Sequence, residues 1–121
     1  MSDCVFCDIV NGRGKSTIVK DWPGALAIVP KNPVTFGHTL VIPRVHADNA
    51  AVDPQLTGLV AGYAAELAAS WAVTKDFNLI VNCGAAASMT VPHLHWHIVP
   101  RREGDGLSLP WTGQTVGGDQ S

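Results

Sequence analysis

The chain has 121 residues, of which 46% are hydrophobic and 15% are charged, and its formal net charge is −2. This balance predicts one globular domain and argues against a disordered chain or a protein that chiefly grips a nucleic acid polymer. The sequence has no apolar run of the roughly 18–20 residues that cross a membrane, and it shows no signal peptide pattern. We therefore expect a cytoplasmic protein with no membrane partner.

The first half of the chain predicts a short N-terminal helix or metal-binding knuckle at residues 4–10, followed by three strands. The strands are short apolar or β-branched segments separated by turns that contain Gly and Pro. They are expected at residues 18–20, 25–29 and 39–42.

The second half predicts one long helix and two further strands. Asp53 and Pro54 have the residue types of an N-cap and a first helical position. Apolar residues then recur at helical spacing through Thr74, and we expect them in the core: Leu56, Leu59, Val60, Tyr63, Leu67 and Trp71. Strands are expected at residues 77–82 and 93–100. The order predicts an α+β fold, an antiparallel sheet of about five strands with one long helix and a short N-terminal helix.

The domain is expected to span residues 1–102. Residues 103–121 are rich in glycine and polar residues, and they predict a C-terminal tail that packs on the domain or on a dimer partner. Arg101 and Arg102, just before the tail, are interpreted as a solvent-exposed basic pair, with contact to a polyphosphate as the alternative.

Three of the five histidines fall within five residues, at His93, His95 and His97. On a strand they would share one face, while Leu94 and Trp96 would pack under the helix. Three aligned imidazoles are a poor structural choice, because they repel one another when protonated. Besides a solvent-exposed histidine face, two interpretations remain open at this point: a metal site, or a neutral imidazole that attacks phosphorus.

The cysteine pattern helps to divide the histidines between these two kinds of chemistry. Cys4 and Cys7 form a Cys-x-x-Cys motif, and His46 and His93 can complete a tetrahedral structural zinc site. The alternative for the cysteines is a pair of buried thiols. If zinc takes these four ligands, His38, His95 and His97 remain for catalysis.

Together these residues resemble the histidine triad (HIT) superfamily of nucleotide hydrolases and transferases, in its zinc-bearing bacterial form. The resemblance rests on four blocks in order: residues 4–10 (CVFCDIV), 32–46 (NPVTFGHTLVIPRVH), 82–84 (NCG) and 93–99 (HLHWHIV). It implies a HIT-like fold, commonly a homodimer, with structural zinc on the same four ligands. It also implies hydrolysis at the α-phosphate of a nucleoside phosphoramidate, dinucleoside polyphosphate or related nucleotide conjugate.

The resemblance assigns roles to individual residues. His95 would attack the α-phosphorus to give a nucleotidyl-histidine intermediate, His97 would contact phosphoryl oxygens or the leaving group, and His38 would complete the site. The loop at residues 84–90 would present backbone N–H groups to phosphate. The expected substrate contacts are Phe6, Ile9, Asn32, Asn82, Gly84, Ser88, Met89 and Thr90.

The chain departs from the family pattern at two positions. Pro30 stands where many relatives carry an acidic residue for the ribose hydroxyls, and Met89 stands where many have glutamine. These departures favour one alternative to the hydrolase, a non-catalytic nucleotide-binding or interaction module. A nucleotidyltransferase and a zinc hydrolase whose triad binds the metal are two further alternatives.

Overall fold

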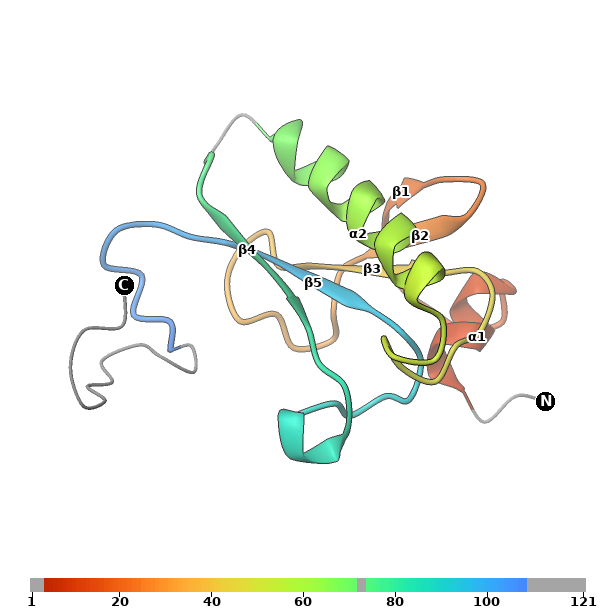
Figure 1. The fold of residues 1–121 in the computed structure, drawn as a ribbon. Helices are drawn as coiled ribbons and strands as arrows, with labels where there is room; N and C mark the ends of the chain where they lie inside the picture. Colours follow the sequence, from red (N-terminus) through yellow and green to blue (C-terminus); the bar gives the residue numbers. More distant parts are fainter. Residues whose placement is uncertain (1–3, 72–73, 109–121) are drawn as a thin grey trace.

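The structure is a computed structural model that describes residues 4–71 and 74–108 (Figure 1). Its elements, in chain order, are α1 (Val5–Val10), β1 (Ile18–Asp21), β2 (Ala25–Ile28), β3 (Thr39–Pro43), α2 (Pro54–Ala69), β4 (Phe77–Val81), the 3-10 turn η1 (Ala85–Ala87) and β5 (Trp96–Pro100). The predicted α+β fold is confirmed, with a five-stranded antiparallel sheet, one long helix and one short helix.

The sheet has the strand order β1-β2-β3-β5-β4, and every neighbouring pair is antiparallel. The last strand, β5, lies between β3 and β4, so the strand that carries His97 is an interior one. The register pairs Ile28 with Leu40, Leu40 with His97, and His97 with Ile80. These four side chains form a row across one face of the sheet, because directly paired residues share a face.

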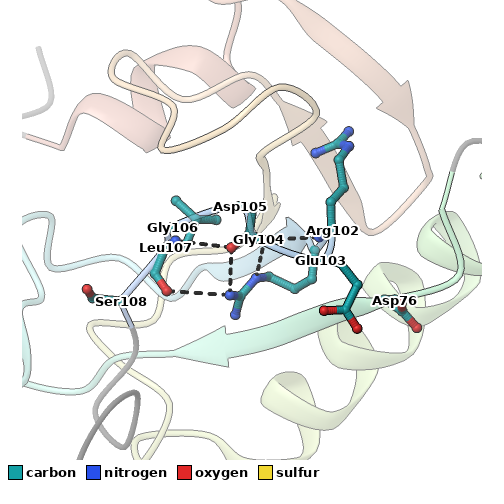
Figure 2. Close-up of a pocket in the computed structure, with 9 residues that line it drawn as sticks. Asp76, Arg102, Glu103, Gly104, Asp105, Gly106, Leu107 and Ser108 are labelled. Carbon is teal, nitrogen blue, oxygen red and sulfur yellow. Dashed lines mark hydrogen bonds and ion pairs between the residues drawn. The ribbon is translucent and has the colours of Figure 1, made fainter.

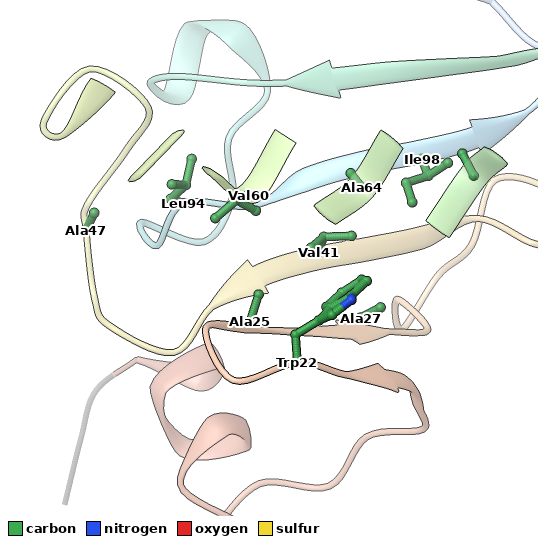
Figure 3. Packing of buried hydrophobic residues seen from close by; sticks show 10 residues of the cluster. Trp22, Ala25, Ala27, Val41, Ala47, Val60, Ala64, Leu94 and Ile98 are labelled. Carbon is green, nitrogen blue, oxygen red and sulfur yellow. The ribbon is translucent and has the colours of Figure 1, made fainter. Parts of the chain in front are cut away.

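Helix α2 covers the opposite face of the sheet, as Figures 1 and 3 show. Its Val60, Ala64 and Ala68 are buried against small and branched side chains of the strands. Helix α1 instead packs Phe6 and Ile9 against a second cluster formed by Leu26, Ile28, Leu40 and Ile42. Both faces of β2 and β3 are therefore covered, which explains why these strands read as continuous apolar runs.

The long helix begins as predicted but ends earlier. The Asp53 carboxylate accepts the backbone N–H of Leu56 at 3.1 Å, as expected of an N-cap. The helix stops at Ala69, where the Ser70 hydroxyl donates to the carbonyl of Leu67 at 2.6 Å. The expectation that Leu59 lies in the core was wrong, because α2 turns it outward and half of its surface is exposed. Across the described residues, no helix is both long and apolar enough to span a membrane.

The prediction that β5 begins at His93 was also wrong. The backbone N–H of Leu94 donates to the carbonyl of Ala47 at 2.7 Å, so this segment pairs with a loop and the strand starts at Trp96. The alternation of side chains nevertheless holds, because Leu94 and Trp96 both belong to the cluster under α2. His93 and His95 point the other way and are buried, so the imidazoles do not form a solvent-exposed face.

Candidate active site and metal centre

Four side chains from three segments converge on one point. Cys4 and Cys7 come from the start of α1, His46 follows β3, and His93 precedes β5. Their donor atoms all lie within 4.8 Å of one another. The Nδ1 atom of His93 is 3.3 Å from Cys4 Sγ, 3.5 Å from Cys7 Sγ and 3.1 Å from His46 Nδ1.

The second nitrogen of each imidazole in this cluster already has a hydrogen-bond acceptor. His93 Nε2 lies 3.1 Å from the carbonyl oxygen of Pro43, and His46 Nε2 lies 2.7 Å from Asp48 Oδ1. Both acceptors lack a hydrogen, so each Nε2 carries the proton and each Nδ1 presents a lone pair. Two lone pairs facing one another at 3.1 Å repel, and a shared cation would remove that repulsion.

The geometry of the cluster fits tetrahedral zinc. Zn–S bonds of about 2.3 Å and Zn–N bonds of about 2.0 Å place the ligand atoms about 3.3–3.8 Å apart. Four of the distances between these imidazole nitrogens and thiol sulfurs run from 3.1 to 3.5 Å, and all the donor atoms lie within 4.8 Å of one another. Carboxylate or carbonyl acceptors on the outer imidazole nitrogens are also typical of metal-binding histidines. The four predicted ligands are thus brought together in an arrangement that can hold the ion.

The middle histidine of the triad lies beside this cluster but does not belong to it. Nδ1 of His95 is 2.8 Å from the carbonyl oxygen of His93, so Nδ1 donates and Nε2 carries the lone pair. The ring contacts Phe6 edge-on at 5.1 Å and His97 at 5.0 Å. Burial lowers the pKa of His95, partly offset by the hydrogen bond to the carbonyl. His95 is therefore a neutral imidazole with a nucleophilic nitrogen at neutral pH.

A chain of two hydrogen bonds fixes the tautomer of His97. The backbone N–H of Val34 donates to His38 Nδ1 at 3.0 Å, so the proton of His38 is on Nε2. That Nε2–H lies 3.0 Å from His97 Nδ1 and can only donate to it. His97 must then carry its own proton on Nε2. Burial, followed by the charges of His95 and His38, lowers the pKa of His97 to about 4, and burial lowers that of His38.

Two cavities flank these histidines on the α1 side of the sheet. The first has a volume of about 340 Å³ and is lined by residues that include Phe6, Ile9 and Leu40. The second has a volume of about 280 Å³ and is lined by Val34, His38, Ile80, Asn82, His97, Val99, Leu107 and Ser108. Leu40 and Ile80 are the cross-strand partners of His97 on its two sides. A molecule reacting at the histidines could therefore extend into both cavities.

The segment after β5 is fastened by a hydrogen-bonded ion pair, which Figure 2 shows. Arg101 binds Asp105 through two contacts of 2.8 and 3.0 Å, and it also donates to Asn78 Oδ1 at 2.9 Å. Asp105 accepts the backbone N–H groups of Arg102 and Leu107, each at 3.0 Å. The Arg101 guanidinium and these N–H groups hold the pKa of Asp105 well below its usual range. The interpretation of Arg101 as part of a solvent-exposed basic pair was therefore wrong.

The expected substrate contacts divide into two groups. Phe6 and Ile9 line the first cavity, and Asn82 lines the second together with His38 and His97. Asn32 is exposed in the loop between β2 and β3.

In the loop at residues 84–90, four backbone N–H groups have partners within the loop. The N–H groups of Ala87 and Met89 donate to the carbonyl of Gly84, and that of Ser88 donates to Ala85. The N–H of Gly84 lies 3.5 Å from the sulfur of Met89. These four donors serve the loop itself, so in this conformation they are not directed at a phosphate. Thr90 is exposed at the end of the loop.

The outer wall of the second cavity is formed by Leu107 and Ser108, which belong to the predicted C-terminal tail. Sequence reasoning did not assign either residue to the site. The available signal was the pair of glycines at 104 and 106 around Asp105, four residues after Arg101. That pattern favours a tight turn closed by an ion pair. The remainder of the predicted tail, residues 109–121, lies outside the described residues.

Comparison with known proteins places this arrangement in a family. A family model for the HIT domain matches residues 11–104. The chain is 35% identical over 121 residues to the adenylylsulfatase HINT3 of Arabidopsis thaliana. The aligned region covers 95% of this chain but only 59% of HINT3. It is also 35% identical over 106 residues to an uncharacterized HIT-like protein of Methanocaldococcus jannaschii, covering 85% of this chain and 82% of that one.

Solved structures give the same result. A zinc-bound histidine triad family protein from Mycobacterium smegmatis superimposes with a TM-score of 0.81 at 37% identity, covering 88% of this chain and 80% of that one. A HIT family hydrolase from Clostridium thermocellum gives a TM-score of 0.76 at 32% identity, covering 90% of this chain and 99% of that one. The chain therefore belongs to the HIT, or histidine triad, family.

Proposed function

We propose that this chain is a nucleotidyl hydrolase that releases a nucleotide from its α-phosphorus conjugate through a covalent nucleotidyl-His95 intermediate. The observation that carries the proposal is the set of tautomers in the triad. The hydrogen bond to the His93 carbonyl leaves the lone pair of His95 on Nε2, while the Val34–His38–His97 chain leaves a proton on His97 Nε2. A nucleophile and a hydrogen-bond donor thus stand side by side.

In the first step, His95 Nε2 gives its electron pair to the α-phosphorus. The bond from phosphorus to the leaving group breaks, and the leaving nitrogen or oxygen keeps that electron pair and takes a proton from water. The Nε2–H of His97 donates to the phosphoryl oxygens or the leaving atom as negative charge develops there. The new charge on the His95 ring is stabilised by its Nδ1–H, which donates to the His93 carbonyl.

In the second step, a water oxygen attacks the same phosphorus. The P–N bond to His95 breaks, its electron pair returns to Nε2, and the proton of the attacking water neutralises the hydroxide left by the first step. The sum is one water consumed, one nucleotide and one protonated leaving group released. Burial suits both steps, because it keeps the His95 imidazole neutral and therefore nucleophilic.

The nucleotide itself is proposed to bind with its base and sugar in the first cavity. Phe6 and Ile9 line this cavity, and Phe6 also touches the His95 ring, so a ligand there lies next to the nucleophile. Pro30 lines it as well, where a carboxylate would be able to bind ribose hydroxyls. We propose that apolar contact provides most of the affinity for the nucleoside.

We also propose that Cys4, Cys7, His46 and His93 hold a structural zinc ion. Zinc bound there would join α1 to the segments on either side of the site. Phe6 lies between two of these ligands in sequence, and its ring is 5.6 Å from His93 and 5.1 Å from His95. Among the described residues this is the one group of donor atoms close enough to hold a metal. We therefore favour covalent catalysis over a catalytic metal held by the triad. That the chain forms a homodimer stays a prediction.

Turnover of a substrate panel tests the proposed reaction. Adenosine 5′-phosphoramidate, diadenosine tetraphosphate and adenosine 5′-phosphosulfate would be incubated with the wild type and with His95→Ala. We expect the wild type to release AMP from at least one of them and the variant, at unchanged melting temperature and zinc content, to release none. Full activity in the variant would overturn the mechanism. Tight binding by the wild type without turnover would support a binding module instead.

A further inference from the structure

The second cavity lies beside His97 and has no role yet in the proposed reaction. His97 lines this cavity directly, and its Nε2–H is the donor available to a leaving atom. The first cavity lies on the other side of His97 in the sheet, over Leu40 and Ile28. A phosphorus held at the histidines with its nucleoside in the first cavity would therefore direct its leaving group into the second.

The lining of the second cavity is largely apolar. Val34, Ile80, Val99 and Leu107 contribute hydrocarbon, while the polar groups are imidazoles, one amide and one hydroxyl. The described lining includes no ammonium, guanidinium or carboxylate group. With a volume of about 280 Å³, the cavity suits a compact and uncharged leaving group.

The outer wall of this cavity depends on the ion pair described above. Arg101 donates to the carbonyl of Leu107 at 3.4 Å, and Asp105 accepts the N–H of Leu107 at 3.0 Å. Both members of the Arg101–Asp105 pair therefore bind the backbone of Leu107 (Figure 2). Asn78 on β4 fixes Arg101 in turn, at 2.9 Å. The position of Leu107 relative to the sheet is thus set by this network.

We propose that Arg101 is a positioning residue and Leu107 a specificity-determining residue: the Arg101–Asp105 pair holds Leu107 as the wall that limits the size of the leaving group. The inference rests on the proposed function, because it assigns the expelled group to the cavity beside His97. Each extra or missing methylene in an apolar pocket changes discrimination by about tenfold or more, so one leucine is enough to set a limit.

The test compares two adenosine 5′-phosphoramidates, one with an unsubstituted nitrogen and one with a naphthylmethyl group on it. The readout is the ratio of kcat/KM for the bulky substrate to kcat/KM for the small one, because this ratio does not depend on the fraction of folded enzyme. Leu107→Ala should raise the ratio by about tenfold and Leu107→Trp should lower it by about as much. Leu59→Ala, at an exposed leucine on α2, is the matched control and should leave the ratio unchanged.

Arg101 is tested by the same ratio. Arg101→Gln should raise the ratio, as Leu107→Ala does, and Arg101→Lys should give a ratio between those of the wild type and Arg101→Gln. Arg102→Gln should leave the ratio unchanged. An unchanged ratio in both Leu107→Ala and Arg101→Gln would overturn the inference and leave the hydrolase intact. If the wild type cleaves neither of these substrates nor any member of the panel above, the proposed function fails and the inference falls with it.

Discussion

Replacing His38 with leucine removes the hydrogen bond that sets the tautomer of His97. At present His38 Nε2–H donates to His97 Nδ1 at 3.0 Å, which leaves the His97 proton on Nε2, facing the site. A neutral hydrogen bond contributes about 1 kcal/mol net. Losing it shifts the ratio of the two His97 tautomers by about fivefold, since 1.4 kcal/mol corresponds to tenfold. Since kcat follows the fraction of His97 that carries its proton on Nε2, we expect it to fall by up to about fivefold in His38→Leu.

His38→Gln is the matched comparison, because the glutamine amide nitrogen can take the place of His38 Nε2 and donate to His97. We expect the kcat of this variant to stay within about twofold of the wild-type value, because the hydrogen bond to His97 is kept. Nitrogen-15 NMR of the imidazole rings reads the His97 tautomer without any substrate. An unchanged tautomer and unchanged kcat in His38→Leu would refute the reasoning.

Three further predictions concern stability and metal content. Gly37 has φ +90° and its added methyl would lie 3.0 Å from a proline ring, so Gly37→Ala should lower the free energy of unfolding in urea by about 1–2 kcal/mol. Gly58→Ala, in α2 where nothing lies within 4 Å of the added methyl, should instead raise the free energy of unfolding by about 0.5–1 kcal/mol. A more stable Gly37→Ala than Gly58→Ala would contradict the structure. His97 ionises near its ordinary pKa when unfolded but only at about 4 when folded, so the unfolded chain binds more protons in that window. Stability should therefore be lost as pH falls from about 6.5 towards 4, and urea titrations at a series of pH values should show a smaller loss in His97→Gln. Cys7→Ser should lose zinc by elemental analysis and lower Tm, whereas Cys83→Ser, at an exposed cysteine outside the cluster, should do neither.

The parts of the fold that could be predicted are those set by local chemistry. Asp53 caps α2 as its position before a proline suggests, and Leu94 and Trp96 face the core as strand alternation requires. The start of β5 could not be predicted, because a contact with Ala47, distant in sequence, decides it. The position of Leu107 in the site depends on Asn78 and on an ion pair, which are tertiary contacts that no periodicity reveals.

The site shows the same division. Residue types and spacing were sufficient to identify the four candidate zinc ligands, which the structure brings together, because Cys-x-x-Cys and two histidines offer a complete tetrahedral set. They were not sufficient for the loop at residues 84–90, where four of the backbone N–H groups donate within the loop. Whether such a loop turns its amides inward or towards a ligand depends on its backbone conformation, here on the positive φ of Gly84 and Ser88.

The most direct test of the account is to trap the covalent intermediate. The enzyme would be mixed with adenosine 5′-phosphoramidate, quenched within milliseconds in alkali, which preserves a phosphorus–histidine bond, and analysed by intact mass and peptide mapping. The account predicts one adenylyl group per chain, located on His95 and absent from His95→Ala. AMP release at full rate with no adduct on His95 at any quench time would contradict it.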